Sequence, residues 1–172
     1  MKPRLALLVG MIFTAAAVRL LPHLPNFEPI AALALFGGAH LEDKRWAFIV
    51  PLGAMLLSDA FIGFHGQMPV VYGTFACIVC MGLFLSQRQT AVSVTGAALL
   101  ASTFFFVVTN LGVWAFDSLY PMTVEGLAAC YVAAIPFFGY SVAGTLFYTA
   151  ILFGGFALAQ RKMPSLASAM HS

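Results

Sequence analysis

The strongest constraint on this chain is a series of long apolar runs that are nearly free of charge. Only 8% of its 172 residues are Asp, Glu, Lys or Arg, and 62% are hydrophobic. Soluble domains carry roughly 25% charged residues, so this chain has too few to cover a water-facing surface. A run of about 20 apolar residues is long enough to cross a bilayer as a helix. The sequence therefore predicts a single integral membrane domain over residues 1–172, surrounded by the lipid bilayer.

Six apolar segments make up most of the chain. The predicted fold is an all-α bundle of six membrane-spanning helices, at about residues 5–21, 26–41, 46–63, 68–85, 91–116 and 130–159. The second segment is short and contains Gly37-Gly38, so it is either a short span or a broken one. The last segment is too long for one straight span, and Pro136 is expected to divide it. The connection 117–129 is either an ordinary loop or a short amphipathic lid.

Basic residues are distributed asymmetrically between the connections of these segments. If the N-terminus is cytoplasmic, seven of the eight Lys and Arg residues are cytoplasmic as well, and Arg19 is the exception. The seven are Lys2, Arg4, Lys44, Arg45, Arg88, Arg161 and Lys162. Cytoplasmic loops of membrane proteins carry an excess of Lys and Arg. The pattern therefore predicts cytoplasmic N- and C-termini, whereas the formal charge of +2 gives no indication of nucleic-acid binding.

Polar side chains inside apolar segments are candidates for a functional site, because they are expensive to place in a membrane. Many of them lie between residues 51 and 82, a region that is typical of two helices joined by a turn. Four are expected toward the outer side: Ser58, Asp59, His65 and Tyr72. We expect this region to form one wall of an outward-open cavity. The alternative is that Asp59 only caps its helix and that His65 is an exposed residue with no role.

Two further candidates lie outside this region. Arg19, near the outer end of the first segment, is expected to pair with Glu28 or with Asp59. Asn110, late in the fifth segment, faces either the bundle or a ligand. The predicted outer ligand site therefore contains Arg19, Asp59, His65, Tyr72 and Asn110.

The fourth segment carries Cys77 and Cys80, and the third cysteine is Cys130. Side chains four residues apart share a helix face, so Tyr72 and Cys80 are expected on one stripe. Cys80 lies about 18 Å along the helix from Met68 at 1.5 Å per residue, which places it at the floor of the predicted cavity. The alternative is that Cys80 is a buried free cysteine that acts as a small hydrophobic residue. The two neighbouring cysteines have no second pair, so a zinc or thioredoxin-like site is a weak interpretation.

Several enzyme motifs are absent from the sequence. It contains no Walker A motif, no HExxH and no GxSxG, so this chain holds no ATPase and no complete catalytic set for an intramembrane enzyme. A small six-helix protein with an outward polar cluster and no energy-supplying domain suggests the capture or transport of a solute. A structural membrane protein without a ligand is the alternative from a different class.

Short stretches along nearly the whole chain resemble one family of transporters. They are NFEP at 26–29, AALALFGGA at 31–39, Pro51-Leu52, LSD at 57–59 and VYGTF at 71–75. The chain resembles the BtuM family, predicted bacterial vitamin B12 transporters that are related to the substrate-binding S-components of energy-coupling-factor (ECF) transporters. The resemblance implies an S-component-like fold of six helices in the bacterial cytoplasmic (inner) membrane. It also implies that the protein binds cobalamin on the outer side and takes it up.

The resemblance further implies that a cysteine of the fourth helix ligates the cobalt of cobalamin. We place this role at Cys80, with Cys77 as the alternative. A thiolate is a soft ligand that suits transition metals. Sulfur on one face of the cobalt would displace the dimethylbenzimidazole base and weaken the bond to cyanide on the other face. We therefore hypothesise base-off binding and assistance by Cys80 in the reductive decyanation of cyanocobalamin, with cobalamin as the substrate and no free metal ion.

One departure from the family bears on the partner. S-components that dock a shared ECF module usually carry Ala-x-x-x-Ala in the first helix, whereas this chain has Ala6 and Gly10 at that spacing. The difference argues against the usual ECF partner and suits a solitary transporter equally well. The runner-up function is an S-component for another vitamin-like or nucleobase-like solute. Such a solute would bind through Arg19, Asp59 and Asn110 without a thiol.

Overall fold

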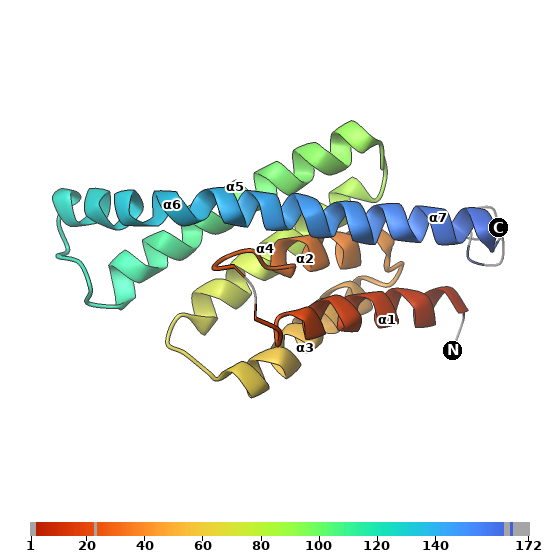
Figure 1. The fold of residues 1–172 in the computed structure, drawn as a ribbon, viewed down its shortest axis with the longest axis horizontal. Helices are drawn as coiled ribbons and strands as arrows, with labels where there is room; N and C mark the ends of the chain where they lie inside the picture. The colour runs from red at the N-terminus through yellow and green to blue at the C-terminus, as the bar shows by residue number, and fades with distance from the viewer. Residues whose placement is uncertain (1–2, 23, 164–165, 167–172) are drawn as a thin grey trace.

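The computed structural model of the chain describes residues 3–22, 24–163 and 166, and these residues form helices and connections without a strand. The helices are α1 (Pro3–Val18), α2 (Ile30–His40), α3 (Lys44–Ile62), α4 (Met68–Leu85), α5 (Ala91–Phe116), α6 (Val124–Thr149), the π-helical turn η1 (Ala150–Gly154) and α7 (Gly155–Lys162). The last three follow one another without a break and form one long rod (Figure 1). The described part of the chain is therefore a bundle of six helices, as the apolar segments predict.

Four of these helices are long and apolar enough to cross a membrane: Lys44–Ile62, Met68–Leu85, Ala91–Phe116 and Val124–Lys162. Their outer faces carry large apolar side chains that the protein leaves uncovered, among them Phe84 and Val92, which are 79% and 83% exposed. Soluble monomers rarely expose extensive apolar surface of this kind. The predicted membrane character of the protein is confirmed at this level.

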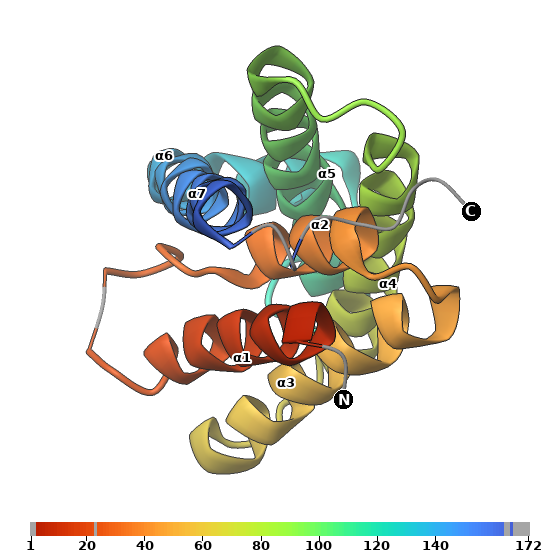
Figure 2. The same ribbon diagram turned by 90° about the vertical axis from the view of Figure 1, so that its right-hand side faces the viewer.

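Helix α2 lies at the centre of the bundle, with the other helices around it (Figure 2). Ten of its eleven residues are buried. At 1.5 Å per residue a helix of this length extends about 16 Å, roughly half of the hydrocarbon thickness of a bilayer. Of the two sequence-based alternatives, the structure therefore shows a short helix that is enclosed by protein rather than by lipid.

Close packing between α2 and α4 depends on two glycines that face each other. A Cβ atom on Gly38 would overlap the backbone carbonyl oxygen of Val79, and one on Gly82 would overlap the carbonyl oxygen of Leu35. Small residues at helix contacts in membranes allow the two backbones to approach. The glycine pair thus sets the separation of the central helix from its most extensive neighbour.

The connection between α1 and α2 is longer than the sequence predicts. Helix α1 ends at Val18 instead of residue 21, and α2 begins at Ile30 instead of residue 26. Prolines at 22, 25 and 29 explain the difference, because proline lacks the amide hydrogen that a continuing helix needs. The segment 19–29 is consequently free to line a cavity with side chains and backbone.

The last rod also differs from the prediction. Helix α6 begins at Val124 rather than at residue 130, because the Thr123 side chain caps it by accepting a hydrogen bond from Gly126 N at 3.1 Å. The interpretation of 117–129 as a lid is therefore wrong for its second half. Pro136 lies inside α6 and does not divide it, since membrane helices tolerate proline where neighbours re-satisfy the backbone. The irregularity is instead the π-helical turn η1.

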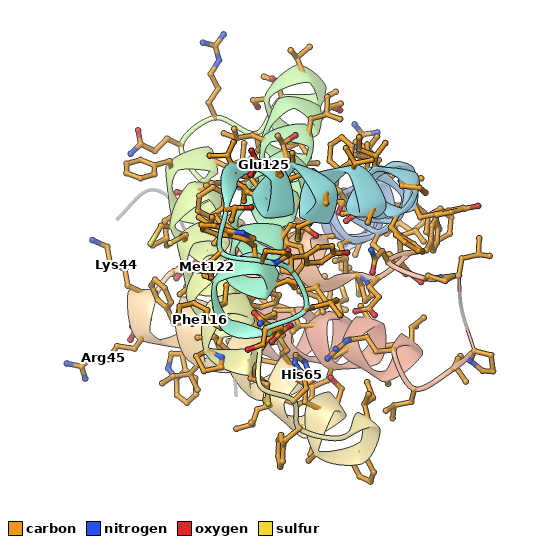
Figure 3. The ribbon with its side chains drawn as sticks, turned by 90° about the vertical axis from the view of Figure 1, so that its left-hand side faces the viewer. Lys44, Arg45, His65, Phe116, Met122 and Glu125 are labelled. Carbon is orange, nitrogen blue, oxygen red and sulfur yellow. The ribbon has the colours of Figure 1, made fainter. Side chains whose placement is uncertain are left out.

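The two ends of the bundle differ in charge. The start of α1, the end of α7 and the 41–43 and 86–90 connections lie at one end, with the described Lys and Arg residues other than Arg19 (Figure 1). We call this the basic end. The opposite half holds the 19–29, 63–67 and 117–123 connections and the carboxylates Glu28, Asp59, Asp117 and Glu125. We call this the acidic end, and Figure 3 looks onto it.

Candidate functional site

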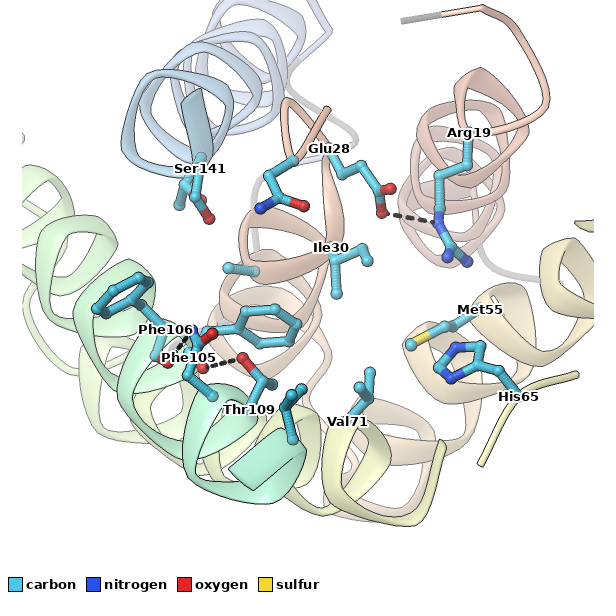
Figure 4. Close-up of a pocket in the computed structure, with 15 residues that line it drawn as sticks. Arg19, Glu28, Ile30, Met55, His65, Val71, Phe105, Phe106, Thr109 and Ser141 are labelled. Carbon is cyan, nitrogen blue, oxygen red and sulfur yellow. Dashed lines mark hydrogen bonds and ion pairs between the residues drawn. The ribbon is translucent and has the colours of Figure 1, made fainter. Parts of the chain in front are cut away.

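A cavity of about 300 Å³ lies in the acidic half, between the 19–29 connection and helices α2 to α6. We call it the Arg19 cavity (Figure 4). Its polar lining residues are Arg19, Asn26, Glu28, His65, Thr109, Asn110, Ser141 and Thr145. Its apolar lining includes Ile30, Val71, Phe105 and Phe106. The cavity therefore combines hydrogen-bonding groups with apolar walls, as small-molecule sites do.

The guanidinium of Arg19 is the most buried charge of this cavity, with 8% of its side chain exposed. Its Nη1 donates to Asp59 Oδ1 at 2.7 Å and to the hydroxyl of Ser58, and its Nε donates to Glu28 Oε2 at 3.3 Å. An isolated charge is very costly in an apolar environment, so these partners are what permits an arginine here. The sequence offers Glu28 or Asp59 as partner, and the structure shows both.

Asp59 is in turn held by Tyr72. The Tyr72 hydroxyl donates to Asp59 Oδ2 at 2.7 Å, so both carboxylate oxygens of this buried side chain have a partner. Ser58, the third partner of the guanidinium, donates its own hydrogen to Met55 O at 2.8 Å. Asp59 and Tyr72 do not line the cavity. They hold Arg19 in position from the side of the guanidinium that faces away from the cavity. We call Arg19, Glu28, Asp59 and Tyr72 the Arg19 network.

Helix α5 supplies the wall opposite Arg19. Thr109 Oγ1 donates to Phe105 O at 2.7 Å, and Asn110 Nδ2 donates to Phe106 O at 2.8 Å. Because a carbonyl can only accept, the amide nitrogen of Asn110 must face the helix, and its oxygen is left to face elsewhere. No described residue donates to that oxygen, so Asn110 offers an acceptor to a bound molecule.

The structure brings together five of the six residues that the sequence singles out. Arg19, His65 and Asn110 line the cavity, and Asp59 and Tyr72 join its network. Asn26, Thr109, Ser141 and Thr145 were not anticipated. Ser141 and Thr145 are four residues apart on α6, a spacing that places side chains on one helix face. The sequence therefore contains two indications of these residues: the four-residue spacing of Ser141 and Thr145, and the position of Thr109 next to Asn110.

Cys80 lies apart from this group. It lines a second cavity of about 860 Å³ at the basic end. Arg4, Lys44 and Gln87 line the same cavity. Cys80 and Cys77 are both exposed. The predicted single cavity, with Tyr72 on its wall and Cys80 at its floor, is therefore not what the structure shows. The physical reason is α2, which fills the centre of the bundle between the two cavities.

The described residues contain no group of three or more His, Cys, Asp or Glu side chains that could hold a metal ion. The Arg19 network has only two carboxylates, and both face the guanidinium. What the arrangement can do chemically is to bind a molecule through ionic, hydrogen-bonding and aromatic contacts.

Comparison with known proteins gives one match. A family model described as a family of unknown function, DUF6580, matches residues 1–166. No curated protein and no solved structure matches the chain. None of these comparisons bears on the resemblance to the BtuM family, which stays a prediction.

Proposed function

This chain belongs to DUF6580, a family of unknown function, and we propose from its site that it binds a small vitamin-like solute in the Arg19 cavity and carries it across the membrane. This is the runner-up function of the sequence analysis, an S-component-like protein that recognises its solute without a thiol. The observation that carries the proposal is the convergence of eight polar side chains on one cavity inside an apolar bundle. Polar groups at such depth mark substrate pathways in membrane proteins.

Two features of the cavity support a bound solute rather than a purely structural network. Its volume of about 300 Å³ is at the lower limit of small-molecule sites, which span roughly 300–1,000 Å³. In addition, Asn110 donates its amide to Phe106 O at 2.8 Å, which leaves its side-chain oxygen to act as an acceptor beside the cavity. A solute with a hydrogen-bond donor would be bound there.

The proposal includes the orientation of the protein. We place six spans in a bacterial cytoplasmic membrane, with both termini in the cytoplasm and the Arg19 cavity open to the outside. The asymmetry of the described Lys and Arg residues supports this orientation, because cytoplasmic connections are enriched in them. The short central helix α2 suits a carrier, since irregular and broken segments in transporters lie where they are enclosed by protein or line a cavity.

The test is the identification of what the purified protein binds. We expect a B vitamin or nucleobase-like solute to copurify with the wild type, to be detected by mass spectrometry after denaturation, and to raise the melting temperature when it is added back. Ser141→Trp, which fills the cavity from α6, should lose the solute. Ala143→Trp, at an exposed position of the same helix, is the matched control. The proposal fails if no solute distinguishes the wild type from Ser141→Trp.

Cobalamin is the second candidate, and the observation that favours it is the exposed thiol of Cys80 beside a cavity of about 860 Å³. A corrin ring with its side chains is far larger than the Arg19 cavity, so the Cys80 cavity is the place to expect it. In the proposed orientation that cavity opens to the cytoplasm, opposite to the outer binding that the resemblance implies. For this reason we rank cobalamin second.

A further inference from the structure

The hydroxyl groups of α6 indicate which class of solute the Arg19 cavity takes, and this inference rests on the proposed function. Ser141, Thr145 and Thr149 follow one another at intervals of four residues, so their side chains lie on one face of the helix. Ser141 and Thr145 line the cavity. Thr145 and Thr149 are only 2% and 3% exposed. This hydroxyl face of α6 is therefore turned into the protein and not toward lipid.

The hydroxyl face differs from the neighbouring wall in how its hydroxyls are satisfied. A hydroxyl in a helix can donate to a carbonyl of the preceding turn, as Thr109 of α5 does to Phe105 O at 2.7 Å. Thr149 Oγ1 is buried and has no hydrogen-bond partner among the described residues. Ser141 and Thr145 form no side-chain hydrogen bond within the described part of the chain either. Because buried polar groups normally find partners, the hydroxyl face indicates a bound molecule.

Asn110 of α5 defines the complementary group that such a molecule must carry. Its amide nitrogen donates to Phe106 O at 2.8 Å, so its oxygen faces the solute as an acceptor and requires a donor there. The hydroxyls of Ser141 and Thr145 can donate as well as accept, so they can bind a carbonyl oxygen. The polar part of the cavity therefore suits a solute that carries an N–H donor and a carbonyl acceptor close together.

The remaining walls are apolar. Ile30, Met55, Val71 and Phe105 line the cavity apart from its polar residues (Figure 4). A sugar or another polyol carries hydroxyls on all sides, and those that meet these walls would lose their hydration without a new partner. A flat ring has apolar faces and polar atoms only at its edge, and its face can stack on an aromatic side chain. The walls therefore favour a flat heterocyclic ring.

The charges of the cavity are engaged with each other. Among Lys, Arg, Asp and Glu, the described residues that line it are Arg19 and Glu28. These two pair at 3.3 Å, and Arg19 also pairs with Asp59 at 2.7 Å. The groups that are left to recognise a solute are hydroxyls and an amide oxygen, which carry no charge. Burial of an ion without a counter-ion is costly, so the site favours an uncharged solute.

We propose that the solute of the Arg19 cavity is an uncharged cyclic amide of the oxopyrimidine or oxopurine class. Its ring N–H donates to the side-chain oxygen of Asn110, and its carbonyl oxygen accepts from the hydroxyls of Ser141 and Thr145. Its faces lie against the apolar walls, with Phe105 as the aromatic surface. In a cyclic amide the N–H is bonded directly to the carbonyl carbon, so one edge of the ring supplies both groups.

Probes that share a ring and differ in one property provide the first test. Uracil and hypoxanthine are cyclic amides of the two classes. The compound 1,3-dimethyluracil keeps the ring and carbonyls of uracil without its N–H groups, and orotate adds a carboxylate to the same ring. Equilibrium dialysis and the melting temperature are measured for the purified protein in nanodiscs. We expect uracil or hypoxanthine to bind, and to bind at least about ten-fold more tightly than 1,3-dimethyluracil and orotate, the effect of one lost hydrogen bond or more.

Variants of Thr145 test the hydroxyl face with the probe that binds. Thr145→Val replaces the hydroxyl by a methyl group of similar size and should weaken binding about ten-fold. Its melting temperature without a probe should match the wild type, because the hydroxyl has no partner in the protein to lose. Thr145→Ser keeps the hydroxyl and should retain binding. Thr103→Val is the matched control, since Thr103 is exposed on α5 and donates to Leu99 O.

The contrary outcomes separate this inference from the proposed function. Equal binding of uracil and 1,3-dimethyluracil, or tighter binding of orotate, would overturn the assignment to an uncharged cyclic amide. So would unchanged binding by Thr145→Val, or no binding of uracil and hypoxanthine at millimolar concentration. A copurified solute of another class would overturn it as well and leave the proposed function in place. The proposed function itself fails only if the comparison of copurified solutes between the wild type and Ser141→Trp is negative.

Discussion

At the scale of single residues, the guanidinium of Arg19 connects three segments that are distant in the sequence. It follows the last turn of α1, pairs with Glu28 in the next connection and reaches Asp59 near the end of α3. Removing one partner from a buried ion pair leaves a charge without compensation, which costs far more than the pair contributes. The Arg19 network is therefore part of the site and also stabilises the packing of the acidic half.

Asp59→Ala tests how much the Arg19 network stabilises the protein. We expect a loss of about 3 kcal/mol in the free energy of unfolding, because Arg19 would keep only the uncharged hydroxyl of Ser58 and its longer ion pair with Glu28. Tyr72→Phe should cost about 1 kcal/mol, the usual contribution of one hydrogen bond. Unfolding by titration with a denaturing detergent measures both. Equal effects of the two variants, or a neutral Asp59→Ala, would show that Arg19 does not depend on Asp59.

The cysteines of α4 allow a second prediction at this scale. If cobalamin binds through a thiolate, the visible spectrum of cyanocobalamin should change to the base-off form with the wild type and not with Cys80→Ala. Cys77→Ala is the matched control on the same helix, and it should retain the change. A spectral change that only Cys77→Ala abolishes would move the ligand to Cys77. If the complex of cyanocobalamin with Cys80→Ala shows the same base-off spectrum as the wild-type complex, the thiol has no part in the mechanism.

At the scale of elements, α2 decides how the other helices pack. Its buried surface meets α4 at the facing pair Gly38 and Gly82, where neither residue has room for a Cβ atom. A side chain in that space would force the helices apart along their whole contact. Because α2 also borders the Arg19 cavity through Ile30 and Ala31, a shift of α2 would reshape the site.

Gly82→Ala measures this contact. We expect a loss of about 1–3 kcal/mol in the free energy of unfolding, the usual cost of overpacking. Gly73→Ala is the matched control on the same helix, since nothing lies near the position of its added methyl group. The control should be neutral or more stable, because alanine is favoured over glycine in helices. Similar stabilities of the two variants would contradict the close packing of α2 on α4.

Comparison of elements shows what the sequence can predict. Helices α4 and α5 begin and end at the predicted residues, because polar and turn-forming residues mark their limits, as Thr90 does by capping α5. The enclosure of α2 could not be predicted, since an apolar segment has the same hydropathy whether lipid or protein surrounds it. For the same reason periodicity places Tyr72 and Cys80 on one stripe but does not reveal that α2 separates their surroundings.

The candidate site could also be predicted from the sequence only in part. Arg19, Asp59 and Asn110 could be found from the sequence because a polar side chain in an apolar segment needs a reason to be there. The position of Arg19 and Asn110 around one cavity depends on the packing of five helices, and so does the inclusion of Ser141 and Thr145. Hydroxyl groups can satisfy themselves on the carbonyls of their own helix, so their presence in a membrane segment carries little information about a site.

At the scale of the whole molecule, the two ends differ in the sign of their charge and in what they enclose. The acidic end holds the Arg19 cavity, and the basic end holds the Cys80 cavity. A carrier needs access from both sides of the membrane at different times, and α2 separates the two cavities in the present conformation. In the proposed orientation this conformation has its solute site on the outer side.

Cysteine labelling tests this orientation directly. In a background without Cys77, Cys80 and Cys130, a single cysteine is placed at Met122, an exposed position of the acidic end, or at Gln87, an exposed position of the basic end. A membrane-impermeant maleimide should label Met122→Cys in intact spheroplasts and Gln87→Cys only after lysis. This pattern is expected because the described Lys and Arg residues, apart from Arg19, keep their end in the cytoplasm. The reverse pattern would turn the cavity toward the cytoplasm and refute uptake from outside, and labelling of both in intact spheroplasts would refute the alternation of the six spans.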